Sequence, residues 1–177
     1  MSESNIVFNK NTLKALLLFA AKKDVRYYLN GIHIVVKNGV VTLTASDGHT
    51  MIRLIKECHE SVNIDLIIPR YIVEHSLKVS DGCKSQYVLF QTESNKLGQL
   101  WFDPIDAKYP EFNVKAIKDD NPPDDTVAFN VIYLLRLQNA YHLENGSSYR
   151  IPRIMYSMKC ARVDIGSGFA LAMAANA

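Results

Sequence analysis

The sequence predicts an α+β fold of three repeated units, each built from a strand, an amphipathic helix and an antiparallel sheet. The first observation is a β-hairpin: residues 31–36 are apolar and β-branched, Asn38-Gly39 form a turn, and residues 40–45 return as a strand. The second is a repeat, because an apolar strand followed by a helix start occurs three times, about 60 residues apart. Both observations favour sheets covered by helices over a helical bundle.

Each unit begins with a short apolar strand that leads directly into a helix. In the first, residues 6–9 precede a helix expected over residues 11–23, where apolar side chains recur at helical spacing. In the other two, the strands are residues 66–69 and 127–130, and the helices are residues 70–79 and 131–143. Pro69 suits the start of the second helix.

Strands are expected after every helix. They cover residues 31–57 in the first unit, 86–92 and 98–102 in the second, and 149–165 and 169–173 in the third. Residues 103–112 contain two prolines and are expected to be irregular.

The predicted domain organisation is one complete domain and one half domain. Residues 1–117 hold two units, residues 118–125 are a charged linker with two prolines, and residues 126–177 hold a single unit. A lone unit exposes edge strands. We therefore expect it to dock on the first domain, on a second copy or on another protein.

Composition limits the class of protein. The 177 residues are 48% hydrophobic, which is enough for an ordinary core. No apolar run reaches the roughly 18 residues of a membrane span, and the first residues do not resemble a signal peptide, so we expect a cytoplasmic protein with no membrane partner. Cys58, Cys83 and Cys160 are too far apart to suggest a disulfide framework or a zinc site. The net charge of +2 leaves the location of the basic residues to decide whether nucleic acid is a partner.

The sequence also argues against catalysis. Asp47 and His49 lie close together on a turn at residues 46–49, but no nucleophile signature, phosphate loop or HExxH motif accompanies them. The other histidines lack metal-ligand spacing. We expect a protein that is not an enzyme and that needs no cofactor or metal.

Two motifs carry a resemblance to a known family. Residues 24–31, Asp-Val-Arg-Tyr-Tyr-Leu-Asn-Gly, and residues 45–49, Ala-Ser-Asp-Gly-His, resemble the middle domain of the bacterial DNA polymerase III β subunit, the sliding clamp. Further matches follow in order at residues 68–70, 109–112 and 129–135. The chain thus resembles the middle domain and the latter half of the third, with nothing corresponding to the first.

The resemblance implies a DNA clamp-like fold. In the family, twelve strand-helix units form a ring whose helices line a hole around duplex DNA. Three units in each of four copies would also give twelve, which motivates the hypothesis of a homo-oligomer that forms a tetrameric ring. A clamp loader is an implied partner.

The resemblance also implies a DNA-binding face, which holds phosphates without reading sequence. The implied residues are Lys22, Lys23, Arg26 and Arg70, with Lys10, Lys14, Lys78 and Arg136 on the same three helices. Such side chains also simply solvate exposed helices. Tyr27 and Tyr28 fit either stacking on a single-stranded end or packing in the core.

A second implied site is a pocket for the short apolar peptides of polymerases and repair proteins. Its walls are Leu29, Ser46, Gly48, His49, Thr50 and Met51 on one side, and Asn130, Tyr133, Leu171, Ala172 and Met173 on the other. Apolar side chains, a close backbone and an adaptable Met suit such a pocket. Leu29, Met51 and Leu171 fit a core equally well. Thr50 stands where the family commonly has Arg, and residues 173–177 lack the family's Met-Pro-Met-Arg-like tail.

Two functions follow from these expectations. The first is a sliding clamp-like protein that encloses or contacts duplex DNA and tethers replication or repair proteins. The alternative is a binding module that forms no ring and captures clamp-binding peptides or a full-length clamp, as an adaptor or inhibitor.

Overall fold

The computed structural model describes residues 4–60, 62–81, 85–112, 127–146, 152–157, 159–166 and 168–175. The expected linker at residues 118–125 lies outside the described residues. In chain order the elements are β1 Asn5–Asn9, α1 Lys10–Leu17, the 3-10 turn η1 Tyr27–Leu29, β2 Gly31–Lys37, β3 Val40–Ser46, β4 Thr50–Glu57, β5 Ile64–Pro69, α2 Arg70–Asp81, β6 Tyr87–Gln91, β7 Lys96–Leu97, β8 Leu100–Trp101, α3 Val131–Asn145, β9 Ile154–Tyr156, β10 Cys160–Ile165 and β11 Gly168–Met173.

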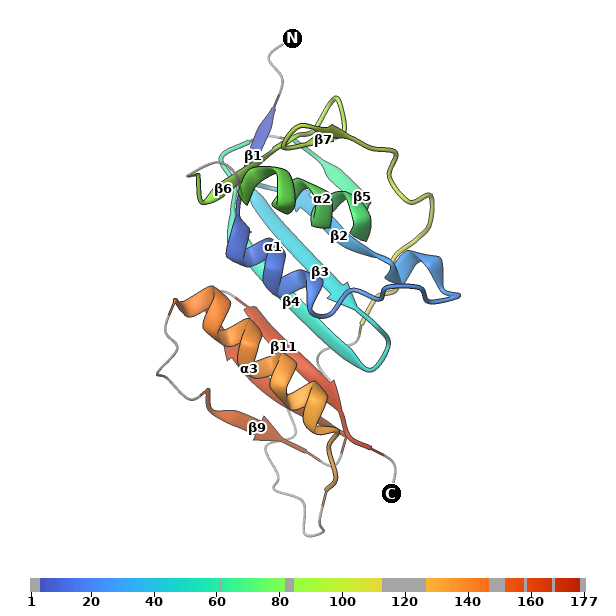
Figure 1. Ribbon diagram of the computed structural model, residues 1–177, viewed down its shortest axis with the longest axis vertical. Coiled ribbons are helices and arrows are strands. Elements are labelled where there is room, and N and C mark those ends of the chain that lie inside the picture. The colour runs from blue at the N-terminus through green and yellow to red at the C-terminus, as the bar shows by residue number, and fades with distance from the viewer. Residues whose placement is uncertain are drawn as a thin grey trace.

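The architecture is α+β, as the sequence predicts. The three helices lie in front of the strands in Figure 1, with α1 between α2 and α3. We name three units by their residues: the first unit is 5–57, the second unit is 64–101 and the third unit is 127–175. The expected hairpin is present, and Asn38 and Gly39 adopt the positive φ values of 52° and 73° that its turn requires.

The first and second units exchange their leading strands. β1 of the first unit pairs with β6 of the second, and β5 of the second pairs with β2 of the first, in both cases antiparallel. The helices α1 and α2 are linked in the same reciprocal way, because the side chain of the first residue of each bonds to carbonyls near the end of the other. The Lys10 ammonium donates to the Ser80 carbonyl near the end of α2, and the Arg70 guanidinium donates to the Leu17 and Ala20 carbonyls at the end of α1. Each helix therefore supplies the cation that caps the other.

The third unit extends the sheet of the first through one strand pair, and α3 packs beside α1. β11 lies antiparallel to β4, which completes a seven-stranded sheet in the order β5-β2-β3-β4-β11-β10-β9. Of the three docking partners considered above, the described residues show the third unit docked on its own chain. The smaller sheet has the order β1-β6-β7-β8.

The two faces of the large sheet are covered differently. Toward the helices, Ile34, Leu43 and Leu54 are fully buried with Leu16 and Phe19 in the main core. The irregular stretch at residues 103–112 covers part of the other face.

A backbone bond and a ring contact help to hold this stretch, and Ile105, Ala107 and Phe112 pack against a small core cluster. The Ile105 amide donates to the Ile67 carbonyl of β5, and the buried Tyr109 ring stacks on His33 with centroids 4.6 Å apart. Both faces of the sheet therefore carry apolar cover at this end.

Two predicted elements are wrong. Helix α1 ends at Leu17 rather than at residue 23, because Arg70 takes the Leu17 and Ala20 carbonyls and the Ala21 amide donates instead to the Leu29 carbonyl. Residues 127–130 form no strand; within this stretch the Ala128 carbonyl accepts a bond from the Ala175 amide.

Candidate functional site

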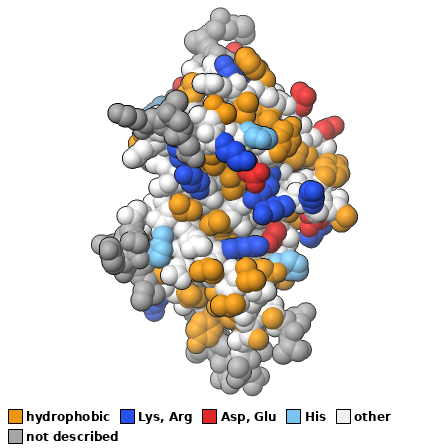
Figure 2. Space-filling model, viewed as in Figure 1, with side chains coloured by type: hydrophobic (Ala, Val, Ile, Leu, Met, Phe, Trp, Pro, Cys, Tyr) orange, Lys and Arg blue, Asp and Glu red, His pale blue; other side chains and the backbone are white. Residues whose placement is uncertain are grey.

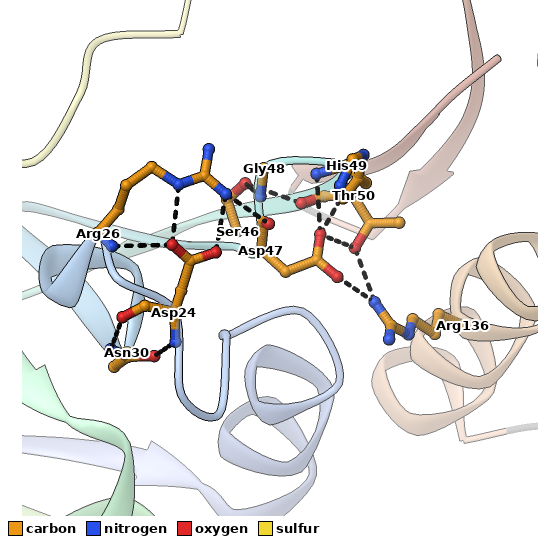
Figure 3. Close-up of polar contacts among 9 residues, drawn as sticks. All are labelled: Asp24, Arg26, Asn30, Ser46, Asp47, Gly48, His49, Thr50 and Arg136. Carbon is orange, nitrogen blue, oxygen red and sulfur yellow. Dashed lines mark hydrogen bonds and ion pairs between the residues drawn. The ribbon is translucent and has the colours of Figure 1, made fainter. Parts of the chain in front are cut away.

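The turn between β3 and β4 is built around the Asp47 carboxylate. Its Oδ1 accepts bonds from the backbone amides of His49 (3.0 Å) and Thr50 (2.7 Å) and from the Thr50 hydroxyl (2.9 Å). The Ser46 hydroxyl donates to the Thr50 carbonyl and accepts a bond from the Gly48 amide. Figure 3 shows this network. It fixes the turn, so the side chains of His49 and Thr50 have set positions.

Gly48 permits a cation to lie against the turn. Its φ of +88° strongly favours glycine, and without a Cβ the Arg26 guanidinium can lie directly against the turn: a Cβ would be 2.6 Å from Arg26 Nη2. Arg26 is also bound by Asp24, whose carboxylate accepts from Nε at 2.9 Å and from Nη2 at 2.8 Å. These side-chain bonds lower the pKa of Asp24 to about 2.

The motif at residues 24–31 is a closed loop. Asn30 holds it by accepting from the Asp24 amide (2.8 Å) and donating to the Asp24 carbonyl (2.9 Å). Gly31 follows because a Cβ there would lie 2.5 Å from the Ile67 side chain. Asp24, Arg26, Asn30 and Gly31 thus build this loop and its junction with β5.

Arg136 of α3 connects the third unit to the turn. Its Nη1 donates to Asp47 Oδ2 and, at 3.2 Å, to the Thr50 hydroxyl, while the guanidinium lies 5.4 Å from the centre of the Tyr133 ring. Burial alone would raise the pKa of Asp47, but the bonds from Thr50, Arg136 and His49 outweigh it and hold that pKa below its ordinary value. Asp47 is therefore an anion shared by the first and third units.

The C-terminal strand reaches the same turn. The Met173 amide donates to the His49 carbonyl at 2.9 Å, and the Tyr133 ring stacks on His49 with centroids 5.9 Å apart. The β4–β11 register sets Leu171 opposite Met51. Segments more than a hundred residues apart in the sequence thus meet at this seam.

An apolar pocket of about 170 Å³ lies at the seam. Its lining residues come from four segments: Ser46, Gly48, His49, Thr50, Met51, Phe112, Cys160, Leu171, Ala172 and Met173. The structure therefore brings together eight of the eleven residues that the sequence suggested. Phe112 and Cys160 were missed. Phe112 belongs to the matching stretch at residues 109–112, whereas Cys160 is found only from its register opposite Met173.

Three of the suggested pocket residues do not line it. Leu29 is only 2% exposed and belongs to a small core cluster with Ala21, Ile67 and Tyr109. Asn130 is the N-cap of α3, where its side chain accepts a bond from the Ile132 amide. Tyr133 reaches the pocket only through its contact with His49.

Basic side chains gather around a hollow between α1 and α3. Its volume is about 450 Å³, and its lining includes Lys22, Lys23, Arg70 and Arg136 beside Asp24 and Asp47. Figure 2 shows Lys and Arg side chains across the middle of this helix-bearing face. Lys22 and Lys23 are exposed, while Arg70 is mostly buried and pairs with Glu74.

The other suggested DNA contacts differ in exposure. Lys10 is only 8% exposed and its ammonium caps α2, so it offers little surface for contact with a phosphate. Lys14 is half-buried on α1 and Arg26 is exposed. Tyr27 is exposed, whereas Tyr28 packs against the small cluster that contains Leu29.

The described residues contain neither a cluster of metal ligands nor a membrane-spanning helix. Across the ranges given above, no three His, Cys, Asp or Glu side chains converge as metal ligands. Among the helices of the same residues, none is both long and apolar enough to cross a membrane.

Comparison with known proteins gives consistent matches. The family model described as DNA polymerase III beta subunit, central domain, matches residues 7–111. The beta sliding clamp of Proteus mirabilis is 28% identical over an alignment of 138 residues, and the match covers 72% of this chain and 37% of that protein. This chain therefore spans little more than a third of that relative's length.

Solved structures share the fold. A DNA polymerase sliding clamp from Pseudomonas aeruginosa superposes with a TM-score of 0.71 at 14% identity, covering 100% of this chain and 68% of that one. The DNA polymerase III beta subunit of Thermotoga maritima gives a TM-score of 0.69 at 14% identity, covering 98% and 65%.

Proposed function

This chain belongs to the DNA polymerase III β-subunit family, the sliding clamps, and from that premise we propose that it contacts duplex DNA without sequence specificity and tethers replication or repair proteins. The DNA would lie against the helix face that carries Lys22 and Lys23. The partner peptide would occupy the pocket between residues 46–51 and 171–173.

The pocket is the observation that carries this proposal. It is apolar, lies at a seam between two units, and is bordered by the backbone of Gly48 and by the His49 side chain. Such a site suits an extended apolar peptide, because its backbone can approach a glycine while its side chains enter the cavity. Met51 and Met173 have flexible side chains that repack around different partners.

Peptide binding is tested by fluorescence anisotropy with a labelled clamp-binding peptide from a bacterial DNA polymerase. Met173→Asp should weaken binding by at least about tenfold, because it sets a carboxylate in an apolar site. Met173 is 54% exposed, so folding should be unaffected. Val7→Asp, at an exposed apolar position of β1 that is 58% exposed, is the matched control. Equal affinity of both variants and the unchanged chain would exclude this pocket.

Contact with DNA is supported by the cations around the α1–α3 hollow. Affinity for a duplex should fall steeply with salt and should not depend on its sequence. Replacing Lys22 and Lys23 together with Gln should lower the slope of log K against log salt by about 1 to 2. Lys37→Gln, on the β2–β3 hairpin, is the control and should leave the slope unchanged. An unaltered slope in the double variant would place DNA elsewhere.

Enclosure of DNA by a homo-oligomeric ring belongs to the proposal as well. It is supported by the shared fold and by the repeat of three units, although the chain spans only 37% of the curated relative. A ring should be retained on closed circular DNA at high salt and should slide off after linearisation. Equal retention on both would favour the alternative, a clamp-like module that captures peptides without encircling DNA.

A further inference from the structure

The two edge strands of the seven-stranded sheet, β5 and β9, differ in how their outer edges are covered. At one end, the outer edge of β5 is covered by the irregular stretch, whose Ile105 amide donates to the Ile67 carbonyl at 3.0 Å. At the other end lies β9, whose residues Ile154, Met155 and Tyr156 are all exposed. Among the described residues, no strand pairs with the outer side of β9. Its apolar composition makes it an unprotected edge.

The backbone of β9 has groups free to accept another strand. The Ser157 amide donates to the Cys160 carbonyl, so Ser157 and Cys160 form a hydrogen-bonded pair of the antiparallel ladder. Bonded and non-bonded pairs alternate along an antiparallel ladder, so Met155 bonds toward β10. The amide and carbonyl groups of Ile154 and Tyr156 therefore point away from β10, toward the open side.

Helix α3 also has an apolar flank without cover. Arg136 and Glu144 contact the first unit through Asp47 and Lys56. At 100° per residue, Val131 and Leu135 lie on the opposite flank of the helix, and both are exposed. This flank faces away from the first unit.

The equivalent positions in the other helices are charged. Lys10 and Lys14 stand at the first and fifth positions of α1, and Arg70 and Glu74 stand there in α2. Between α1 and α2, the first-position cations cap the partner helix. Helix α3 instead closes its own end: the Gly146 amide donates to the His142 carbonyl, and the Asn145 side chain donates to the Tyr141 carbonyl. It needs no cation from a partner.

We propose that β9 and the Val131/Leu135 flank of α3 bind the same surface of a second copy of this chain across a two-fold axis. Residues 127–130 of each copy lie along β9 of the other, as β1 lies along β6 and β5 along β2. The same exchange sets Val131, the first residue of α3, near the end of the partner's α3, as Lys10 lies near the end of α2 and Arg70 near the end of α1. Leu135 lies closer to the two-fold axis and faces its own equivalent. Two third units thereby form one domain of two units, as the first and second units do within one chain.

This interface deepens the homo-oligomer part of the proposed function by naming the surface that assembles. The test is the solution mass of the full chain by light scattering and sedimentation, over a dilution series. The unchanged chain should show twice its 20.0 kDa mass, or a larger assembly built from such dimers. Leu135→Glu should weaken self-association roughly a hundredfold, because two carboxylates would face each other in an apolar contact.

Two further variants complete the design. Val79→Glu alters an apolar residue of α2 that is 45% exposed, against 52% for Leu135, and should leave the mass unchanged. Tyr156→Pro removes an amide that points away from β10, so the fold should tolerate it while the dimer weakens. Circular dichroism confirms folding of each variant.

Two results of the mass measurement would contradict the proposed interface. A chain that is monomeric throughout the series, or a Leu135→Glu variant that assembles as well as the unchanged chain, overturns the interface. Peptide anisotropy on the same samples keeps the two failures apart, since Leu135 lies outside the pocket. Peptide binding by a monomeric chain would overturn the interface and the ring, and would leave the peptide-binding part of the proposed function standing. A Leu135→Glu variant that assembles as well as the unchanged chain would overturn this interface alone.

Discussion

The first and second units are held together in a different way from the first and third. The former exchange strands in both directions and cap each other's helices through Lys10 and Arg70. The latter share one strand pair, β4–β11, the packing of α3 beside α1, and two ion pairs, Asp47–Arg136 and Lys56–Glu144. The same kind of unit thus makes a closed junction in one case and a one-sided junction in the other. The one-sided junction leaves space for a pocket and keeps a sheet edge open.

Substituting two glycines that lie very close to a neighbouring strand tests this difference most strongly. A Cβ at Gly31 would meet Ile67 Cγ2 at 2.5 Å and block the β2–β5 pair, while one at Gly168 would meet the Arg53 carbonyl at 2.0 Å and block β4–β11. Gly31→Ala should lower the unfolding free energy of the whole chain by about 3 kcal/mol or more. Gly168→Ala should release only the third unit.

Hydrogen exchange separates the two results. In Gly168→Ala, amides of residues 160–173 should lose protection while those of residues 31–57 keep it. Loss of protection throughout the chain in both variants would mean that the three units unfold as one and that the junctions do not differ.

Removing a capping cation should have the next largest effect. Arg70→Met leaves the carbonyls of Leu17 and Ala20 without their donor, at a cost of about 2 to 3 kcal/mol. Urea unfolding measures this loss. Arg162→Met, which breaks an exposed pair with Asp164 on β10, is the control and should cost under about 1 kcal/mol. Similar costs for both would remove the capping role.

Acid should loosen the one-sided junction through Asp47. Hydrogen bonds hold the pKa of this carboxyl in the folded chain below its ordinary value of 3.8. Its contribution is therefore complete above pH 3.8 and is lost as the pH falls through the lower folded value. Arg136→Gln should destabilise the third unit by about 1 to 2 kcal/mol at neutral pH. Thermal unfolding between neutral pH and about pH 3 should show a smaller acid loss in this variant than in the unchanged chain.

The smallest effect on stability is expected at Tyr27. Tyr27→Ala should change the unfolding free energy by less than about 0.5 kcal/mol, because the ring is exposed and has only an edge contact with Tyr28. If Tyr27 stacks on a single-stranded end, affinity for a duplex with an overhang should fall by about 1 to 3 kcal/mol while affinity for a blunt duplex stays the same. An affinity for the overhang duplex that is the same in this variant as in the unchanged chain would assign Tyr27 no such role.

Local signals in the sequence predicted the fold well. Asn38-Gly39 located the hairpin, and Pro69-Arg70 located the start of α2. The end of α1 was wrong because its cause is distant in sequence: Arg70 takes carbonyl groups that a longer helix would have used. The burial of Lys10 was not predicted for the same kind of reason, since only the tertiary fold brings Ser80 to it.

The candidate site was predicted less completely. Residues 46–51 and 171–173 were named through the resemblance, and strand pairing brings them together. The Asp47–Arg136 pair joins residues 89 positions apart and had no local signal. Through this pair the Arg136 guanidinium lies at the turn. In the family, the position of Thr50 in this turn is commonly Arg. Leu29 shows the opposite error, because an apolar residue next to a motif fits a core and a pocket equally well.

The seam pocket is tested most directly by mapping a bound peptide on the isotopically labelled chain by NMR. Adding a clamp-binding polymerase peptide should shift the backbone signals of residues 46–51 and 171–173 and of Phe112, and leave those of β6 and β7 in place. Shifts confined to other surfaces, or none at saturating peptide, would contradict a partner site between the first and third units.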